Sequence, residues 1–257
     1  MTSTRWIAGL LWISAGLAQP ANQAGIAHVA FRVADLDAAR AFYNKLGFEQ
    51  FFEMKQGDRT TEAFIKINDR QFIELYPITA PTQTVGLMHV CYESNDLSAL
   101  HADYVNRGLA VSDVRKAGAG NLLMTMKDPE GQTIEYTQYM PGSRHYEDRG
   151  KHLGADRISQ MLVGAAAPAK DVRAVRSFYV EKLGFREVGP HYLVMPGDSG
   201  QELDVVSGGV SGIRFAVSDL KETAGALAKR GLSVKSTPQA ATVADPDGAV
   251  ISFVVQR

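Results

Sequence analysis

Two histidines and two glutamates repeat at one fixed spacing in the first half of the chain. Each histidine lies in a short apolar run (GIAHVAFRV and GLMHVCY), and each glutamate lies in a later run (FIELY and TIEYT). The interval from His28 to Glu74 is 46 residues. The interval from His89 to Glu135 is also 46 residues, and 61 residues separate the two pairs. An internal duplication in this register would bring two nitrogen and two carboxylate ligands around one metal ion.

Two imidazoles and two carboxylates suit a single divalent ion of Fe, Mn, Ni, Co or Zn, and the sequence does not select among them. Such an ion acts as a Lewis acid on two neighbouring substrate oxygens, and a glutamate able to leave it can move a proton on carbon. The alternative is that these are ordinary strand histidines and solvent-facing glutamates, but four positions in one register argue against it. Cys91, the only cysteine, excludes an internal disulfide and predicts a small apolar wall residue near the site.

The composition is that of a soluble globular protein, since 45% of the 257 residues are hydrophobic, 21% are charged and the net charge is −1. A net charge near zero, without a basic stripe carrying interleaved aromatic residues, gives no support for nucleic-acid binding. We therefore expect a small-molecule substrate as the partner, and either a monomer or a homodimer.

Residues 1–18 differ from the rest of the chain. Arg5 precedes an uncharged run from Trp6 to Ala18, which ends in Gly-Leu-Ala before Gln19. A basic start, a short apolar core and small residues before the cut predict a secretory signal peptide, and the run is short for a transmembrane helix. A first core helix or a retained anchor are the alternatives. We expect an exported, periplasmic protein that does not contact the membrane after cleavage.

The local patterns give βαβββ units. In the first unit we expect a helix at 36–46, capped by Asp35 and ended by Gly47, and strands at 26–33, 48–54, 62–68 and 71–77. In the second unit we expect a helix at 97–107 and strands at 87–92, 110–115, 122–126 and 132–138. Segments 177–187, 229–235 and 245–253 echo segments 41–50, 106–112 and 128–136. The chain therefore holds four units, paired two and two.

The pieces HVAFRVADLDAARAFYNKLGF, FIEL, MHVCYES and DPEGQTIEY resemble the vicinal oxygen chelate superfamily, which includes glyoxalase I, methylmalonyl-CoA epimerase, fosfomycin-resistance proteins and extradiol dioxygenases. The resemblance covers nearly all of residues 25–257. It implies an α+β fold in which each pair of units forms a curved eight-stranded mixed sheet with helices outside. One such sheet cups a divalent metal, and the positions that match the family's ligands are His28, Glu74, His89 and Glu135.

By resemblance to glyoxalase I, Glu135 is the catalytic base and Glu74 its partner. Arg32 follows His28 by four residues, so the alternation of a strand places it on the same face. It resembles the arginine that glyoxalase I uses for a carboxylate of glutathione, and an inward arginine would suit any anionic substrate. A salt bridge at the rim of the sheet explains Arg32 equally well.

These patterns predict an N-terminal metal-binding domain over 25–140, a linker over 141–157 and a degenerate C-terminal domain over 158–257. The linker is polar and charged, so we expect it to be solvated. The alternative is a flap that brings His145, Tyr146 or His152 onto a ligand.

In the C-terminal domain the metal ligands are replaced. The alignment puts Gly212 in a histidine position and Ser252 in the position of Glu135. It puts Gln160 near the other histidine position and leaves Glu202 as a possible surviving acid.

Three functions are consistent with these features. The first is a metal-dependent, glyoxalase-like enzyme that performs isomerase, lyase or epimerase chemistry on a small oxygen-rich substrate; export argues against the cytosolic glutathione and acyl-CoA substrates. The second is an Fe(II) extradiol-type dioxygenase, although the common arrangement in that class places three ligands in the C-terminal pair of units. The third is a non-catalytic, resistance-type protein that binds a small ligand.

Overall fold

The computed structural model describes residues 23–190 and 192–255, so the expected signal peptide lies outside the described residues. The first half of the chain contains helices α1 (Leu36–Lys45), α2 (Leu97–Asn106) and α3 (Arg144–Glu147), and strands β1 (Gln23–Val33), β2 (Glu49–Gln56), β3 (Arg59–Lys66), β4 (Phe72–Pro77), β5 (Gly86–Ser94), β6 (Arg115–Lys116), β7 (Leu122–Lys127) and β8 (Thr133–Gln138). The second half contains helices α4 (Val172–Leu183) and α5 (Leu220–Lys229), and strands β9 (Leu162–Ala169), β10 (Arg186–Val188), β11 (Tyr192–Val194), β12 (Glu202–Ser207), β13 (Gly212–Val217), β14 (Lys235–Ser236), β15 (Ala241–Ala244) and β16 (Val250–Val255).

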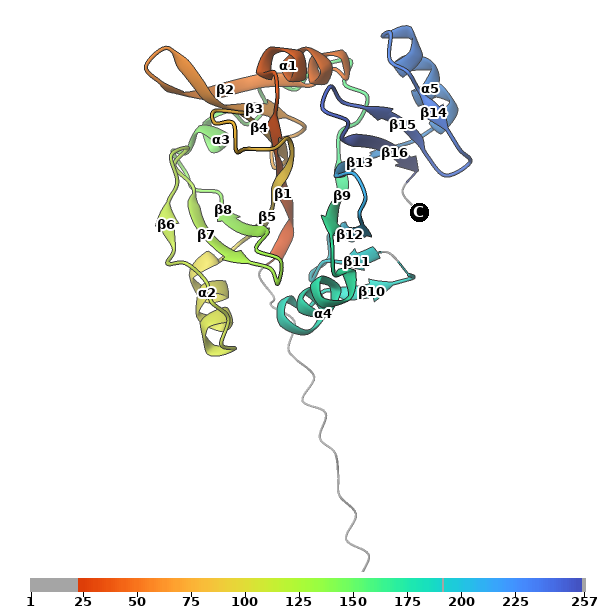
Figure 1. Ribbon diagram of the computed structural model, residues 1–257. Coiled ribbons are helices and arrows are strands. Elements are labelled where there is room, and N and C mark those ends of the chain that lie inside the picture. Colours follow the sequence, from red (N-terminus) through yellow and green to blue (C-terminus); the bar gives the residue numbers. More distant parts are fainter. Residues whose placement is uncertain (1–22, 191, 256–257) are drawn as a thin grey trace, which may run out of the picture.

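Each half forms one eight-stranded mixed sheet, and the two sheets share one strand order, β2-β3-β4-β1-β5-β8-β7-β6 and β10-β11-β12-β9-β13-β16-β15-β14. In the first sheet β1 is parallel to β4 and antiparallel to β5, and β5 is parallel to β8. The second sheet repeats these pairings around β9 and β13. The predicted α+β fold with four βαβββ units is confirmed, and the first sheet curls into a half-barrel (Figure 1).

The helix α1 forms as the sequence predicts. The Asp35 side chain accepts hydrogen bonds from the first-turn backbone at 2.9 and 3.0 Å, which satisfies two of the donors that a helix start leaves open. Gly47 follows the helix with φ of 82°, a conformation that costs glycine little. Phe42 and Tyr43 pack into the core together with Val29 and other side chains of β1.

Within the described part of the chain, no helix combines the length and apolar character needed to cross a membrane.

The prediction of a strand at 110–115 is wrong for most of this segment. Only Arg115 and Lys116 form a strand, and Val111 makes one isolated bridge with Met126. The reason lies at Ser112, whose hydroxyl accepts the backbone N–H of Thr125 at 2.9 Å. This side chain takes the donor that a backbone carbonyl would take in a continuous ladder.

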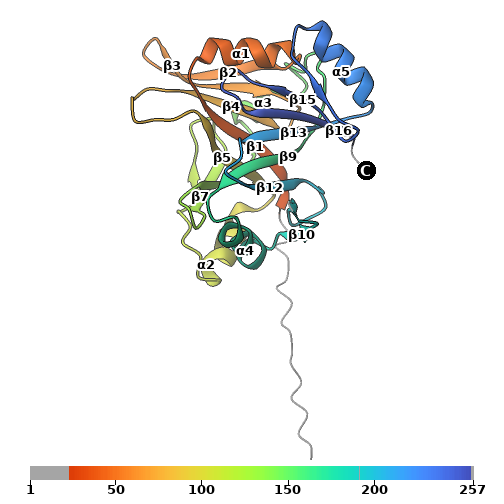
Figure 2. The ribbon, with the colours of Figure 1, turned by 45° about the vertical axis from the view of Figure 1, so that its right-hand side comes forward.

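Two glutamines join the halves where β1 and β9 lie side by side (Figure 2). Gln71 donates to the carbonyl of Ile26 at 3.1 Å and accepts from the backbone N–H of Leu162 at 2.9 Å. Gln201 donates to the carbonyl of Leu162 at 2.9 Å and accepts from the N–H of Ile26. Each glutamine precedes its own inner strand, β4 or β12, so the contact is reciprocal. It ties the strand that carries His28 to the second half.

Candidate metal centre

Four side chains from the inner strands of the first sheet converge on one point. His28 on β1 and His89 on β5 approach each other at 3.0 Å between their Nε2 atoms. The Nε2 atom of His28 lies 3.4 Å from a carboxylate oxygen of Glu74 on β4 and 3.3 Å from one of Glu135 on β8. The Nε2 atom of His89 lies 3.4 and 3.9 Å from the other oxygens of these carboxylates. The four residues paired by sequence spacing are therefore together in space.

These separations fit a shared metal ion better than a hydrogen-bonded cluster. Ligand atoms about 2.0–2.2 Å from a transition metal are about 3.0–3.5 Å apart at tetrahedral or octahedral angles. Four of the five distances between donor atoms fall near this range. Transition-metal ions also bind imidazole and carboxylate ligands, which are the groups present here. His28, Glu74 and His89 form one group of close ligand atoms, and His28, Cys91 and Glu135 form another.

The electrostatics of the cluster call for a cation. Burial lowers the pKa of His28 to about 4 and lowers that of His89, so both imidazoles are neutral near pH 7. Burial raises the pKa of Glu74 to about 7 and raises that of Glu135, because a carboxylate without water is costly to ionise. Neutral imidazoles can bind a metal directly, and a divalent charge would reverse the cost of ionising both carboxylates.

Glu74 is restrained by a chain of polar groups that the sequence analysis did not single out. The Tyr76 hydroxyl lies 3.0 Å from Glu74 Oε2 and 2.5 Å from Glu62 Oε1. A hydroxyl has one proton, so one of the two carboxyl groups must donate to it. Burial and the neighbouring Glu74 raise the pKa of Glu62 to about 8, which keeps Glu62 protonated and lets Tyr76 donate to Glu74. Tyr76 follows Glu74 by two residues on the same strand, so strand alternation was the signal that could have found it.

Glu135 has fewer restraints than Glu74. Its side chain is 13% exposed and that of Glu74 is 8% exposed. Besides the two histidines, its near neighbours are Cys91 and, through charge, Arg115. Cys91 is fully buried, and burial raises the pKa of its thiol, so the sulfur is a neutral wall group near the site as the sequence predicts. Of the two carboxylates, Glu135 is freer to change its position.

The cluster opens into a cavity of about 310 Å³, which we call the cup. Apolar side chains such as Phe64, Phe72 and Leu123 form part of its wall, and Arg115 adds a cation and His145 a further titratable group. The cup is lined by His28, Met54, Glu62, Phe64, Phe72, Glu74, Tyr76, Arg115, Ala117, Gly118, Ala119, Asn121, Leu123, Glu135, Thr137 and His145. His145 comes from α3 in the connector 141–157. We expected this connector to be solvated, but part of it is buried against the cup. Ser143 and Asp148 in the same segment are also buried.

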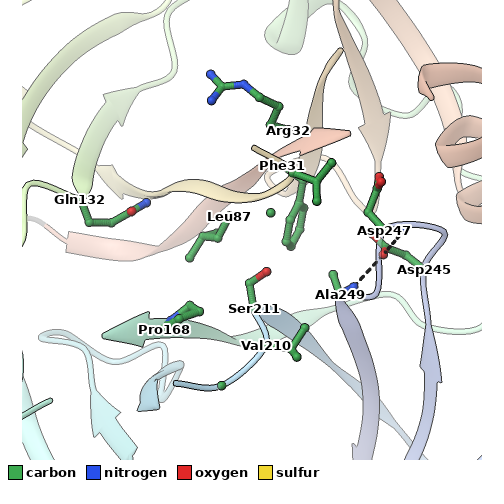
Figure 3. Close-up of a pocket in the computed structure, with 13 residues that line it drawn as sticks. Phe31, Arg32, Leu87, Gln132, Pro168, Val210, Ser211, Asp245, Asp247 and Ala249 are labelled. Carbon is green, nitrogen blue, oxygen red and sulfur yellow. Dashed lines mark hydrogen bonds between the residues drawn. The ribbon is translucent and has the colours of Figure 1, made fainter. Parts of the chain in front are cut away.

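Arg32 does not line the cup. It lines a second cavity of about 330 Å³ between the two halves, together with Gln132, Ser211 and Asp247 (Figure 3). Its guanidinium points away from Asp247 in this view, and its buried Nε atom has no hydrogen-bond partner among the described residues. A register shift between Ala30 and Phe31, where β1 pairs with β5, lies just before it. The structure therefore does not bring Arg32 together with the four ligands.

The second half has the same strand positions, but three of the four ligand residues are replaced. The pairing registers place Gly164 at the position of His28, Gly212 at that of His89 and Ser252 at that of Glu135. Gly212 and Ser252 are as predicted. Two predictions are wrong, because Gly164 and not Gln160 matches His28, and Asp204 and not Glu202 matches Glu74.

Arg214 takes the position of Cys91 in this second sheet. A Cβ atom at Gly164 would lie 3.1 Å from its guanidinium nitrogens, so a histidine there would displace Arg214. The fixed cation of Arg214, 3.3 Å from Glu202, thus lies where the first half has its ligand cluster.

Solved structures with the same fold include a Mn(II)-bound glyoxalase from Novosphingobium aromaticivorans, with a TM-score of 0.70, 16% identity and coverage of 91% of this chain and 82% of that chain. The 2,3-dioxygenase LapB from a Pseudomonas species has a TM-score of 0.71 and 14% identity, with coverage of 91% and 93%. Homoprotocatechuate 2,3-dioxygenase from Arthrobacter globiformis has a TM-score of 0.66 and 17% identity, with coverage of 94% and 82%. These likenesses establish the fold alone. No curated protein sequence matches the chain.

Residues 25–136 match the family model described as Glyoxalase/Bleomycin resistance protein/Dioxygenase superfamily. This stretch contains all four converging side chains and the strands β1 to β8, apart from the first two residues of β1 and the last two of β8. The match and the repeated sheet topology agree with the resemblance drawn from the sequence motifs. Residues 25–136 are therefore identified as similar to the Glyoxalase/Bleomycin resistance protein/Dioxygenase superfamily, and the chain has the two-domain vicinal oxygen chelate fold over both halves.

Proposed function

We propose that the protein is a metal-dependent enzyme that transfers a proton on a small, oxygen-rich substrate, in the manner of an isomerase, lyase or epimerase. The observation that carries the proposal is the convergence of His28, Glu74, His89 and Glu135 at 3.0–3.9 Å between donor atoms. When bound, one divalent ion would supply Lewis-acid polarisation of two neighbouring substrate oxygens.

The residues of the cup would have different roles in this reaction. His28 and His89 lie on fixed strands and are neutral near pH 7. They would therefore act as metal ligands and not exchange protons. Tyr76 holds Glu74 in place by a hydrogen bond of 3.0 Å. Glu135, the freer carboxylate, would take the proton from the substrate carbon and return it to the same or the adjacent carbon. The apolar walls of Phe64 and Phe72 would keep water away from the intermediate.

An Fe(II) dioxygenase is the second candidate, and one observation favours it. His28, Glu74 and His89 form a close group of two histidines and one carboxylate, which is the ligand pattern of non-haem Fe(II) oxygenases. In that case Glu135 would stand beside the ion as a base and not as a ligand. The fold is shared with both glyoxalases and 2,3-dioxygenases, so it does not decide between the candidates.

Metal content tests the site. Elemental analysis of the wild type is expected to give about one transition-metal ion per chain, and the His28→Ala/His89→Ala variant should hold none. His101→Ala, which removes a histidine of α2 outside the cup, is the matched control and should keep the metal. An empty wild type after reconstitution with Mn(II), Fe(II), Ni(II), Co(II) and Zn(II) would contradict the proposal.

The reaction class can then be separated with the loaded protein. Deuterium entering an α-hydroxy carbonyl compound from heavy water, lost in Glu135→Gln with the metal retained, supports proton transfer. Oxygen uptake with catechols supports the dioxygenase. Tight binding of such compounds with neither reaction supports a non-catalytic binding protein. We also propose that the protein acts after export to the periplasm, on the basis of residues 1–18.

A further inference from the structure

The strongest unassigned feature of the cup is His145, which reaches it from the connector between the halves. The residue is 7% exposed, and its ring is surrounded by aromatic rings. The distances between ring centres are 4.3 Å to Phe72, 5.2 Å to Phe52 and 5.4 Å to Phe51. The same Phe72 ring stacks on His28 at 4.6 Å. Burial lowers the pKa of His145 to about 3, so its imidazole is neutral.

The hydrogen bonds around Asn121 determine where the proton of His145 lies. The backbone N–H of Met140 donates to Asn121 Oδ1 at 3.1 Å, so this oxygen is the acceptor end of the amide. The Nδ2 group of Asn121 is then the donor, and it lies 2.9 Å from His145 Nδ1. Nδ1 must accept, which leaves the single proton of a neutral imidazole on Nε2.

This Nε2–H group is buried and has no hydrogen-bond acceptor among the described residues. An unpaired buried donor is costly, and native structures retain few of them without a reason. The side chain that carries it lines the cup together with Glu74 and Glu135.

The connector is also fastened in this position. Ser143 caps α3 through the N–H of Tyr146 at 3.2 Å, and Gly120 comes so close that a Cβ atom there would lie 3.0 Å from Ser143 Cα. On the other side, the buried Lys66 donates to the carboxylate of Asp148 at 2.8 Å and to its carbonyl at 2.6 Å. The imidazole is therefore held in one place before any ligand arrives.

We propose that His145 is a specificity-determining residue whose Nε2–H donates a hydrogen bond to an oxygen of the substrate that is remote from the four ligands. The inference rests on the proposed function, because it places the other end of the substrate at His28, Glu74, His89 and Glu135. Between these two ends the cup is lined by apolar side chains, which favour an apolar middle part of the substrate. They are Met54, Phe64, Phe72 and Leu123. The substrate class is thus a planar or aromatic molecule with two neighbouring oxygens at one end and a hydrogen-bond-accepting oxygen at the other.

Two probes separate this inference from the metal site itself. The first probe, 4-nitrocatechol, has neighbouring oxygens, an aromatic body and distal nitro oxygens. The second, acetohydroxamate, has the paired oxygens alone. In Mn(II)-loaded protein, His145→Phe keeps an aromatic ring and removes the donor. It should bind 4-nitrocatechol about 3- to 10-fold more weakly, as expected for one lost hydrogen bond, with unchanged acetohydroxamate affinity and Mn(II) content.

Tyr146→Phe, a change on the same short helix, is the matched control and should leave both affinities unchanged. In the metal-free wild type, nitrogen NMR of labelled histidine should find the His145 proton on Nε2. The inference is overturned if His145→Phe binds both probes like the wild type, if it weakens both probes equally, or if the proton lies on Nδ1. A wild type that takes up no Mn(II) overturns the proposed function and this inference together, whereas loss of the inference alone leaves metal and acetohydroxamate binding intact.

Discussion

The buried carboxylate of Glu74 should make the metal-free protein lose stability as the pH rises. Glu74 is buried, and burial raises its pKa from an ordinary value near 4.5 to about 7. Below pH 4.5 Glu74 is protonated in both the folded and the unfolded state, so it does not lower the free energy of unfolding. Between pH 4.5 and 7 the unfolded state loses the proton and the folded state keeps it, so the free energy of unfolding falls. The total loss is about 3 kcal/mol and is complete above pH 7.

The Glu74→Gln variant removes this dependence, because its side chain is neutral at every pH. Urea unfolding of the metal-free wild type, followed from pH 4.5 to 8, should show the decrease in the free energy of unfolding, and the variant should show a decrease smaller by about 3 kcal/mol. Circular dichroism is the suitable signal, because both tryptophans, Trp6 and Trp12, lie in the predicted signal peptide.

Asp58→Asn, which removes an exposed carboxylate in the turn between β2 and β3, is the matched control and should follow the wild type. Saturating Mn(II) should abolish the decrease in the wild type, since a bound cation stabilises the ionised carboxylate. Parallel curves for the wild type and Glu74→Gln would refute the reasoning, as would a decrease that Mn(II) leaves unchanged.

Three further outcomes follow from contacts outside the ligand cluster. Tyr76→Phe removes the hydroxyl shared by Glu62 and Glu74 and should cost about 1–3 kcal/mol of unfolding free energy, measured by urea titration at pH 7. Lys66→Met leaves the carboxylate of Asp148 without its buried cation; it should cost about 3–5 kcal/mol, and hydrogen exchange should show faster exchange across 141–157 than in the wild type. Mass spectrometry of the exported protein should find Gln19 as the first residue, and a retained Met1 would contradict the predicted signal peptide.

The four candidate ligands could be found from sequence because strand alternation and duplication leave regular intervals. His28 and His89 lie on neighbouring strands, and each pairs in parallel with the strand that carries its glutamate. The equal intervals follow from that arrangement. Tyr76 was within reach of the same reasoning, because it shares the face of Glu74.

The contact between Asn121 and His145 left no such signal. It joins a loop before β7 to the short helix α3, and neither segment has a periodic pattern. Its geometry depends on hydrogen bonds to Met140 and on the close approach of Gly120 to Ser143. Arg32 shows the opposite case: its spacing from His28 predicted the same face, but it lies at the end of β1, past a register shift, and lines the cavity between the halves. Local propensity fixes strands and faces, while loop contacts and strand ends depend on the rest of the molecule.

The reciprocal contact of Gln71 and Gln201 has the form of an isologous interface, in which one surface meets its own copy across a twofold axis. Here both copies belong to one polypeptide, so the pair of sheets behaves as a dimer fused into a single chain. Fusion lets the two copies diverge, because only one of them needs to keep the chemistry as long as the other keeps the contact. The second half has glycine, glycine and serine at three ligand positions and still holds the backbone of Ile26, two residues from His28, through Gln201. Substitutions in the second half can therefore alter the site through β1, the strand that this half supports.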